Sequence, residues 1–460
     1  MKGGGTVRRR DLVLLALAGL ALLVSLGFFL GAPRLEAVAP AKGEEVAVGW
    51  VEVRLTFSCP VRLKDVEARV AFDPAVPGTW RLEGEGRVAV FTPEAPWPPG
   101  TEVHATLRSG VRAAGWLPWP ALGGRVWRFA VAPVLLAYLS PANGPADLYA
   151  FDPRQGSVSR LTNLNGVLAY AVGPRGRWIY LSVRNTRFGA DLYALDRLSP
   201  EKEPVLLLAC LADVCTAPQP APDGRTLAFQ RSDASGQHLR IWLLDVATGE
   251  ARPVSPENHY AQDPRWSKDG KLAYYDATRQ GYVVLNASRE EEAFFPSDTH
   301  AGYTWTADGQ ALLVVRLQPL PQVKGTHGEP LVTAHLWRLS LTAGVPLDLS
   351  RPAEVEDAAP AADPTGRWIA FARRYMDPDR WTLGRQAWLM TPVGGSPHPL
   401  TQSPNFQHQA FAWSPDGKRL AFVRTDQGDL GLPPEVWVYD LVENTLARVA
   451  VHAYAPWWLP

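Results

Sequence analysis

The sequence predicts an all-β protein whose larger part is a β-propeller of seven blades, with six as the alternative count. Three observations lead to this fold class. A turn followed by an apolar strand recurs between residues 135 and 460 at intervals of roughly 40 to 55 residues, a spacing typical of propeller blades. A second strand follows each of these units. The last residues of the chain supply the strand that the first unit lacks.

The turn of the repeat is clearest in WSPDGKRLAFVR, residues 413–424. Proline presets φ, the aspartate side chain bonds its own backbone, and glycine takes the position that needs positive φ. We therefore interpret these aspartates as turn formers, in preference to calcium ligands. Related turns begin at Gly173, Ala221, Trp266, Thr306 and Asp363, and the second strands begin at Asp147, Asp191, Arg240, Gly281, His335, Gln386 and Glu435.

The copy at Asp147 has the preceding strand LLAYLS but lacks the turn. The missing piece stands at the other end of the chain, where YAPWWLP (residues 454–460) aligns with the segment before the turn at Gly417. We predict that this final strand completes the first blade, because a closed ring leaves no exposed sheet edge. Four tryptophans share one repeat position, and we expect them to pack between blades instead of stacking on carbohydrate. They are Trp266, Trp305, Trp413 and Trp458.

Residues 34–132 alternate apolar and polar side chains between Pro and Gly turns, which predicts a small β-sandwich. This segment resembles the bacterial Ig-like domain of S-layer and other surface proteins, and the resemblance implies a spacer or adhesion module. The matching pieces are the turn at Pro40 and Gly43, TFS before Pro60, FTP at residues 91–93, PGT at residues 99–101 and WRFAV at residues 127–131. Cys59 is expected to be a half-buried thiol without a partner in this domain.

The repeats of residues 133–460 resemble the propellers of TolB-like proteins and the non-catalytic domain of prolyl-oligopeptidase-type peptidases. The resemblance implies the fold and leaves the activity open, because such propellers host many functions. The peptidases also carry a Gly-x-Ser-x-Gly elbow, which this sequence does not contain. The expected seven blades, the Ig-like module and the anchor described next all differ from TolB itself.

An uncharged stretch at residues 12–30 is long enough to span a bilayer. Lys2 and three arginines at residues 8–10 precede it, which orients the N-terminus toward the cytoplasm. We predict that residues 1–33 form a cytoplasmic stub and an uncleaved transmembrane signal anchor, with the bulk of the protein extracytoplasmic. A cleaved signal peptide is the alternative, although its nearest cleavage sites run into Pro33 or Pro40.

The composition argues against nucleic-acid binding, because 46 Lys and Arg residues balance 46 Asp and Glu residues and leave no net charge. No cofactor is expected, and the sequence leaves metal binding open. Cys210 and Cys215 lie close together in a segment expected outside the cytoplasm, so they are candidates for a disulfide, with a zinc pair less favoured.

Two features suggest where a ligand could bind. Counting back from the tryptophan position, His300, Asp357 and His408 stand at the entries of three inner strands, with Glu356 adjacent. Such groups at a channel mouth could hold a divalent metal or an anionic ligand, or simply line a hydrated channel.

Long loops on the face opposite the turns are the second feature, since binding residues often lie on loops held by a rigid scaffold. Tyr375 and Trp381 on the loop of residues 373–385 are candidate ligand contacts. We favour a membrane-anchored extracytoplasmic binding or scaffold protein, whose propeller is a platform for a protein or cell-envelope ligand. The alternative is an enzyme, a hydrolase or lyase of envelope polysaccharide that uses the His/Asp/Glu set.

Overall fold

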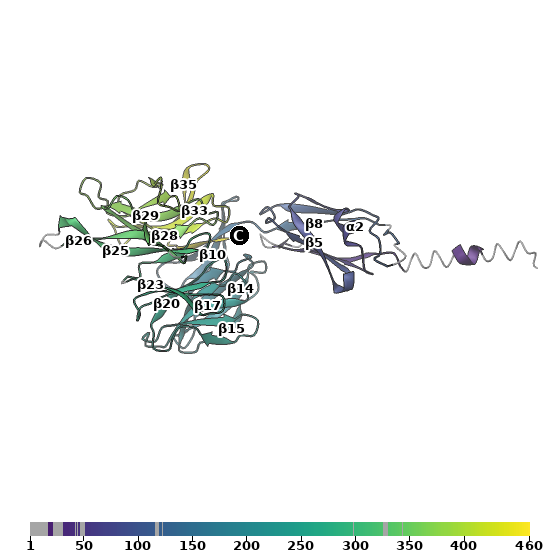
Figure 1. Ribbon diagram of the computed structural model, residues 1–460, viewed down its shortest axis with the longest axis horizontal. Helices are drawn as coiled ribbons and strands as arrows, with labels where there is room; N and C mark the ends of the chain where they lie inside the picture. The colour runs from purple at the N-terminus through teal and green to yellow at the C-terminus, as the bar shows by residue number, and fades with distance from the viewer. Residues whose placement is uncertain are drawn as a thin grey trace, which may run out of the picture. The chain divides into compact units, whose positions relative to one another are not determined.

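The computed structural model describes residues 17–21, 31–41, 43, 45–46, 51–115, 119–121, 123–297, 299–324, 330–342 and 344–460. These residues are almost entirely β-structure and divide into two compact units, residues 1–133 and 134–460 (Figure 1). Most of the anchor predicted at residues 12–30 lies outside the described residues. Among the residues that are described, no helix combines the length and apolar character needed to cross a bilayer.

The first unit is a sandwich of two four-stranded sheets, in the strand orders β1-β3-β6-β5 and β2-β8-β7-β4. Alternate residues of β3, namely Val53, Leu55 and Phe57, are buried, and the indole of Trp97 donates a hydrogen bond to the Val51 carbonyl at 3.0 Å. The elements are β1 (Leu35–Ala39), β2 (Glu45–Val46), β3 (Val53–Phe57), α2 (Leu63–Glu67), β4 (Val70–Asp73), β5 (Gly78–Glu83), β6 (Val88–Pro93), β7 (Glu102–Leu107) and β8 (Arg125–Val131).

Cys59 of this unit is a free thiol that is partly buried. Its sulfur lies 3.7 Å from the Gly31 carbonyl oxygen, and burial raises the pKa of the thiol. The thiol is therefore less ionised and less nucleophilic than an exposed cysteine would be.

The second unit is a propeller of seven four-stranded blades within the described residues, as predicted. Five blades are separate sheets, whereas a single parallel pair between Ala190 and Val214 joins blades two and three into one eight-stranded sheet. Each blade runs from an inner strand outward.

The first four blades have these strands: β36 (Tyr454–Leu459), β9 (Leu135–Ser140), β10 (Asp147–Asp152) and β11 (Ser157–Arg160); β12 (Val167–Val172), β13 (Trp178–Arg184), β14 (Ala190–Asp196) and β15 (Val205–Leu208); β16 (Val214–Pro220), β17 (Thr226–Ser232), β18 (Arg240–Asp245) and β19 (Ala251–Pro253); β20 (Ala261–Trp266), β21 (Leu272–Asp276), β22 (Gly281–Leu285) and β23 (Glu291–Pro296). The last three have β24 (Tyr303–Trp305), β25 (Ala311–Lys324), β26 (Pro330–Ser340) and β27 (Leu347–Asp348); β28 (Val355–Ala362), β29 (Ile369–Tyr375), β30 (Gln386–Met390) and β31 (His398–Pro399); β32 (Phe406–Trp413), β33 (Arg419–Asp426), β34 (Glu435–Asp440) and β35 (Thr445–Val451).

The C-terminal strand β36 closes the ring. It pairs antiparallel with β9, with Leu459 opposite Leu135 and Tyr454 opposite Leu139. It also contacts the inner strands on either side, β32 of blade seven and β12 of blade two. The last strand of the sequence thus supplies the inner strand of the first blade, which confirms the predicted closure.

Tryptophan indoles link successive inner strands. In four blades the indole N–H donates to a backbone carbonyl of the preceding blade's inner strand, at 2.9–3.0 Å. This arrangement confirms that the recurring tryptophans pack between blades. The pairs are Trp266 to Gln219, Trp305 to Arg265, Trp413 to Ala361 and Trp458 to Ala412.

A β-bulge lies three residues before this tryptophan position in most inner strands, and the residue there has positive φ. Alanine fills the position in four blades, glycine in blade five and Asp263 in blade four. A positive φ is unfavourable for any residue with a Cβ atom, and least so for Asp and Asn among them, so the pairing of the inner strand holds the alanines in this conformation. The six residues are Ala217, Asp263, Gly302, Ala359, Ala410 and Ala455, with φ between 47° and 89°.

The Pro-Asp-Gly turns are scaffold, as the sequence indicated. Asp223 accepts hydrogen bonds from the backbone N–H groups of Arg225 and Thr226, and Gly224 has a φ of 69°. Within the described residues, no group of three metal-ligating side chains comes together, at the turns or elsewhere. The turns define one face of the propeller, which we call the turn face.

Cys210 and Cys215 form a disulfide between blades two and three, with Cα atoms 6.2 Å apart. Both residues are buried, and the Cys210 N–H donates to Asp191 at 2.7 Å. The disulfide and this hydrogen bond together tie β16, the inner strand of blade three, to β14, the third strand of blade two.

Removing the side chain that holds the last strand should open the ring. Trp458 is 2% exposed, whereas its neighbour Trp457 is 41% exposed. We expect Trp458→Ala to lower the free energy of unfolding by about 3–5 kcal/mol, because a buried indole and its bond to blade seven are lost. Trp457→Ala, on the same strand, should cost less than about 1 kcal/mol. Chemical denaturation of both variants measures the difference, and equal losses would contradict the closure.

The disulfide should make a smaller contribution because it closes a short loop. We expect Cys210→Ala with Cys215→Ala to lower the free energy of unfolding by about 2 kcal/mol. Cys59→Ala removes a free thiol and is the control for a cysteine change by itself. A double variant as stable as the Cys59→Ala protein, by thermal denaturation under oxidising conditions, would show that the bond does not form.

Candidate binding site on blade six

Asp357, one of the predicted site residues, forms a buried ion pair within its own blade. It lies on β28 and is fully buried, as is Arg373 of β29. The Arg373 guanidinium donates to both carboxylate oxygens, at 2.7 and 2.6 Å, and the Ser350 hydroxyl donates at 2.5 Å. Three donors occupy this carboxylate, so it is already committed to the scaffold.

His408 is buried in blade seven. Its Nδ1 lies 2.8 Å from the Arg385 carbonyl oxygen, and its ring meets the Phe422 ring edge-on at 5.3 Å. Burial lowers the pKa of His408 to about 4, so the ring is neutral near pH 7. It is thus a packed histidine of the scaffold and carries no charge toward the channel.

His300 and Glu356 have other partners. His300 Nε2 lies 3.4 Å from a carboxylate oxygen of Asp263, in blade four. Glu356 accepts hydrogen bonds from Arg374 and Arg385. Arg385 therefore touches both Glu356 and His408, but within the described residues no hydrogen bond or ion pair joins two of the four predicted side chains. The structure does not assemble them as one acid–base or metal site.

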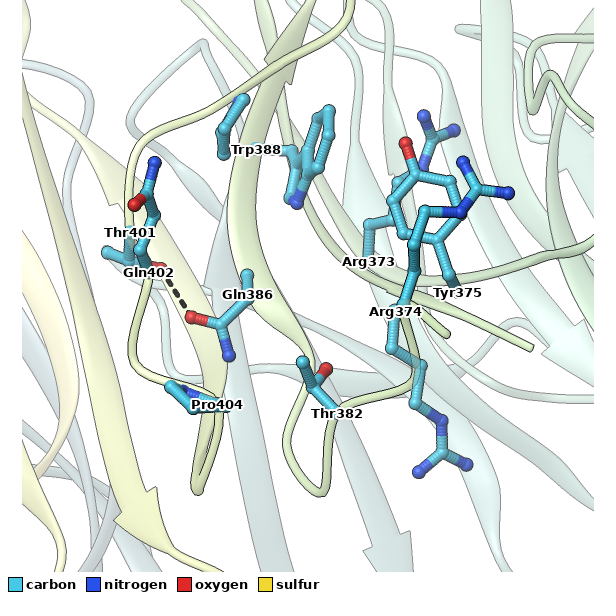
Figure 2. Close-up of a pocket in the computed structure, with 11 residues that line it drawn as sticks. Arg373, Arg374, Tyr375, Thr382, Gln386, Trp388, Thr401, Gln402 and Pro404 are labelled. Atoms are coloured by element: carbon cyan, nitrogen blue, oxygen red, sulfur yellow. Dashed lines mark hydrogen bonds between the residues drawn. The ribbon is translucent and has the colours of Figure 1, made fainter. Parts of the chain in front are cut away.

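A pocket of about 340 Å³ opens on blade six instead. Because β29 runs away from the turn face, the loop that follows it and the pocket lie on the opposite face. Tyr375, Arg373 and Arg374 stand on one side, Thr401 and Gln402 on the other, with Trp388 and Gln386 between them (Figure 2). We call this site the blade-six pocket; its lining is Arg373, Arg374, Tyr375, Arg380, Thr382, Gln386, Trp388, Pro399, Thr401, Gln402 and Pro404.

One wall of the pocket is a repeated scaffold element. In four blades an arginine of the second strand covers a tryptophan of the third strand, with the guanidinium carbon 4.0–5.8 Å from the ring centroid. In blade six this pair is Arg373 and Trp388. The loop after β29 and the connection after β31 add the other walls. The equivalent pairs are Arg231–Trp242, Arg316–Trp337 and Arg424–Trp437.

Each arginine that lines the pocket is paired with a carboxylate. Arg373 is paired with Asp357 and Arg374 with Glu356. Arg380 lies 2.7 Å from Asp377 and covers the Tyr375 ring at 3.9 Å. The hydrogen bond from Arg380 lowers the pKa of Asp377, so this pair is ionised near neutral pH. Every lining arginine is therefore ion-paired, and Arg374 shares the carboxylate of Glu356 with Arg385.

The remaining polar side chains divide into satisfied and free groups. Gln386 donates to the Ser403 carbonyl and accepts from the Ser403 N–H, and Thr401 accepts from the Ala387 N–H. The Tyr375 hydroxyl, the Trp388 indole N–H and the Gln402 amide have no hydrogen-bond partner in the described part of the chain. The pocket can therefore hold a flat or apolar group and offer hydrogen bonds to it.

The two predicted aromatic contacts lie in different surroundings. Tyr375 is the last residue of β29 and lines the pocket. Trp381, the other predicted contact, is outside the lining and 49% exposed, with the Arg374 guanidinium 6.0 Å from its ring. Trp388 was missed because its position reads as an ordinary strand residue. The signal was the recurrence of tryptophan there in four blades, next to an unusually long loop in one of them.

Comparison with known proteins gives the following relatives. Residues 31–129 match the bacterial Ig-like domain family. A 176-residue segment is 24% identical to an uncharacterized peptidase, YuxL of Bacillus subtilis, and covers 38% of this chain and 24% of that protein. A 190-residue segment is 27% identical to the uncharacterized protein YidR of Escherichia coli, covering 41% of each. The chain thus matches less than half the length of these curated relatives.

Solved structures include TolB from Acinetobacter baumannii, with a TM-score of 0.44, 13% identity, and coverage of 87% of this chain and 86% of that one. The strand order described above establishes the propeller independently of that likeness. Residues 31–129 belong to the bacterial Ig-like domain family, and they precede a β-propeller of seven blades.

Proposed function

We propose that this protein is a binding module. The face of its propeller opposite the turn face would meet a partner, with the blade-six pocket as the contact site. The observation that carries the proposal is the pocket itself. Its walls are the aromatic rings of Tyr375 and Trp388, 6.1 Å apart and inclined at 70°, on strands that the scaffold holds in place. Rigid aromatic side chains in a recess are typical anchors of protein and ligand recognition.

We further propose that residues 12–30 anchor the chain in a membrane and that the Ig-like domain is a spacer outside the cytoplasm. The uncharged stretch and the preceding basic residues support this arrangement. The disulfide fits the same side of the membrane, since such bonds persist in oxidising compartments.

The geometry gives less support to a polysaccharide hydrolase or lyase. Hydrolysis of a glycosidic bond uses two carboxyl groups that flank the bond, one of them free to donate a proton, and a lyase needs a base that is free to abstract a proton. Asp357 and Glu356 are each held by arginines, and His408 is buried. The peptidase relative matches only part of this chain, so its printed activity is not carried over.

The binding role is tested by affinity capture with the tagged full-length chain, comparing three proteins side by side. A partner captured by the parent should be lost with Trp388→Ala, since removal of an anchor side chain weakens binding by on the order of 1–3 kcal/mol. Trp242→Ala removes the equivalent tryptophan of blade three and is the matched control. A partner retained by the Trp388 variant, at equal thermal stability, would place the binding surface elsewhere.

The anchor is tested by fractionation. After alkaline extraction the full-length protein should stay with the membrane pellet, and N-terminal sequencing of the extracted protein should begin at Met1 or Lys2. A mature N-terminus after residue 30 would mean that the segment is a cleaved signal peptide and would contradict the anchor.

A further inference from the structure

We propose that the blade-six pocket recognises a proline-rich peptide segment in the extended polyproline II conformation. This inference rests on the proposed binding function and names the class of ligand. It follows from three properties of the pocket: its charge, its hydrogen-bonding capacity and its aromatic surface.

The charge of the lining disfavours an anionic ligand. Arg373, Arg374 and Arg380 are each paired with a carboxylate of the protein, at 2.6, 2.5 and 2.7 Å respectively. A phosphate or uronate would have to compete with those carboxylates for the same guanidinium groups. A neutral ligand does not meet this competition.

The hydrogen-bonding groups favour a ligand that accepts hydrogen bonds. Trp388 can only donate, and the spare N–H groups of Arg380 can only donate. The Tyr375 hydroxyl and the Gln402 amide can also donate, whereas the nearby carboxylates are held by arginines. A polyproline segment matches this set, because its backbone has carbonyl acceptors and no N–H donors.

The balance of hydrogen-bond donors and acceptors in the pocket also disfavours a sugar chain. Each hydroxyl group of a sugar is a donor as well as an acceptor, and a buried donor without an acceptor is costly. The oxygens of Gln386 and Thr401 already accept hydrogen bonds from protein groups, which leaves the hydroxyl oxygens of Thr382 and Tyr375 and the Gln402 carbonyl as acceptors in the lining. A sugar ring whose hydroxyl groups outnumber these acceptors would leave the remainder unpaired.

The shape of the walls fits proline rings. Tyr375 and Trp388 meet nearly edge to face at 6.1 Å, and Pro399 and Pro404 complete the apolar lining. Grooves lined by aromatic side chains bind polyproline helices because the ligand is already extended before it binds and loses little conformational entropy. A volume of about 340 Å³ suits a short stretch of such a segment.

The test is calorimetric titration of the full-length chain, in detergent, with acetyl-hexaproline-amide, an alternating Gly-Ser hexapeptide and chitohexaose. Hexaproline should bind, and the other two should not. Tyr375→Phe and Trp388→Phe keep the aromatic wall but remove one donor each, so each should weaken hexaproline binding about three- to tenfold. Trp242→Phe is the matched control and should leave the affinity unchanged.

The outcomes separate the ligand class from the binding function. Binding of chitohexaose in place of hexaproline, or hexaproline binding that is indifferent to both donor deletions, overturns the peptide assignment. The absence of hexaproline binding at millimolar concentration also overturns it, and the proposed function then still stands if affinity capture depends on Trp388. If capture is also independent of Trp388, both proposals fail.

Discussion

The packing of each blade against the next is the interaction on which this propeller depends. A single four-stranded blade has an inner strand with one unpaired edge and two faces that need cover. Here the neighbouring blade supplies that cover, and tryptophan indoles fix the distance by donating to backbone carbonyls of the preceding inner strand. Because each blade packs against the one before it, an open ring would leave the first and last blades each with one uncovered face. The pairing of β36 with β9 closes the ring.

This constraint also explains how the ionisable side chains are arranged. Arginines at the ends of second strands cover tryptophans of the third strands, and several are paired with carboxylates of the same blade. Charges placed in this way hold the sheet ends together and are not available for chemistry. The histidine and carboxylate set at the inner-strand entries follows the same rule. These residues suggest a converging site in the sequence. In the structure each side chain instead contacts a partner in its own or the neighbouring blade and so belongs to the scaffold.

The binding site arises where one blade departs from the repeat. Four blades share the arginine–tryptophan pair. In blade six the pair is bordered by Tyr375 at the end of β29, by Arg380 of the loop that follows, and by Gln402 and Pro404 of the connection after β31. The repeat thus provides a rigid aromatic wall, and local insertions turn one copy of that wall into a recess. A matched tryptophan in another blade therefore tests the recess separately from the scaffold.

The sequence by itself determined the fold class, the number of blades, the closing strand and the role of the turns. These features follow from local rules: strand alternation, the φ preferences of proline and glycine, and the need of a ring to pair its last edge. It also identified the loop with Tyr375 and the cysteines that form the disulfide. Only the tertiary structure decided which polar residues are free. Asp357 and Trp388 illustrate the reason, since Arg373 of the strand between theirs pairs with one and covers the other. These spatial neighbours decide whether the polar groups of a side chain are bonded within the protein or remain free for a ligand. No local sequence pattern specifies them.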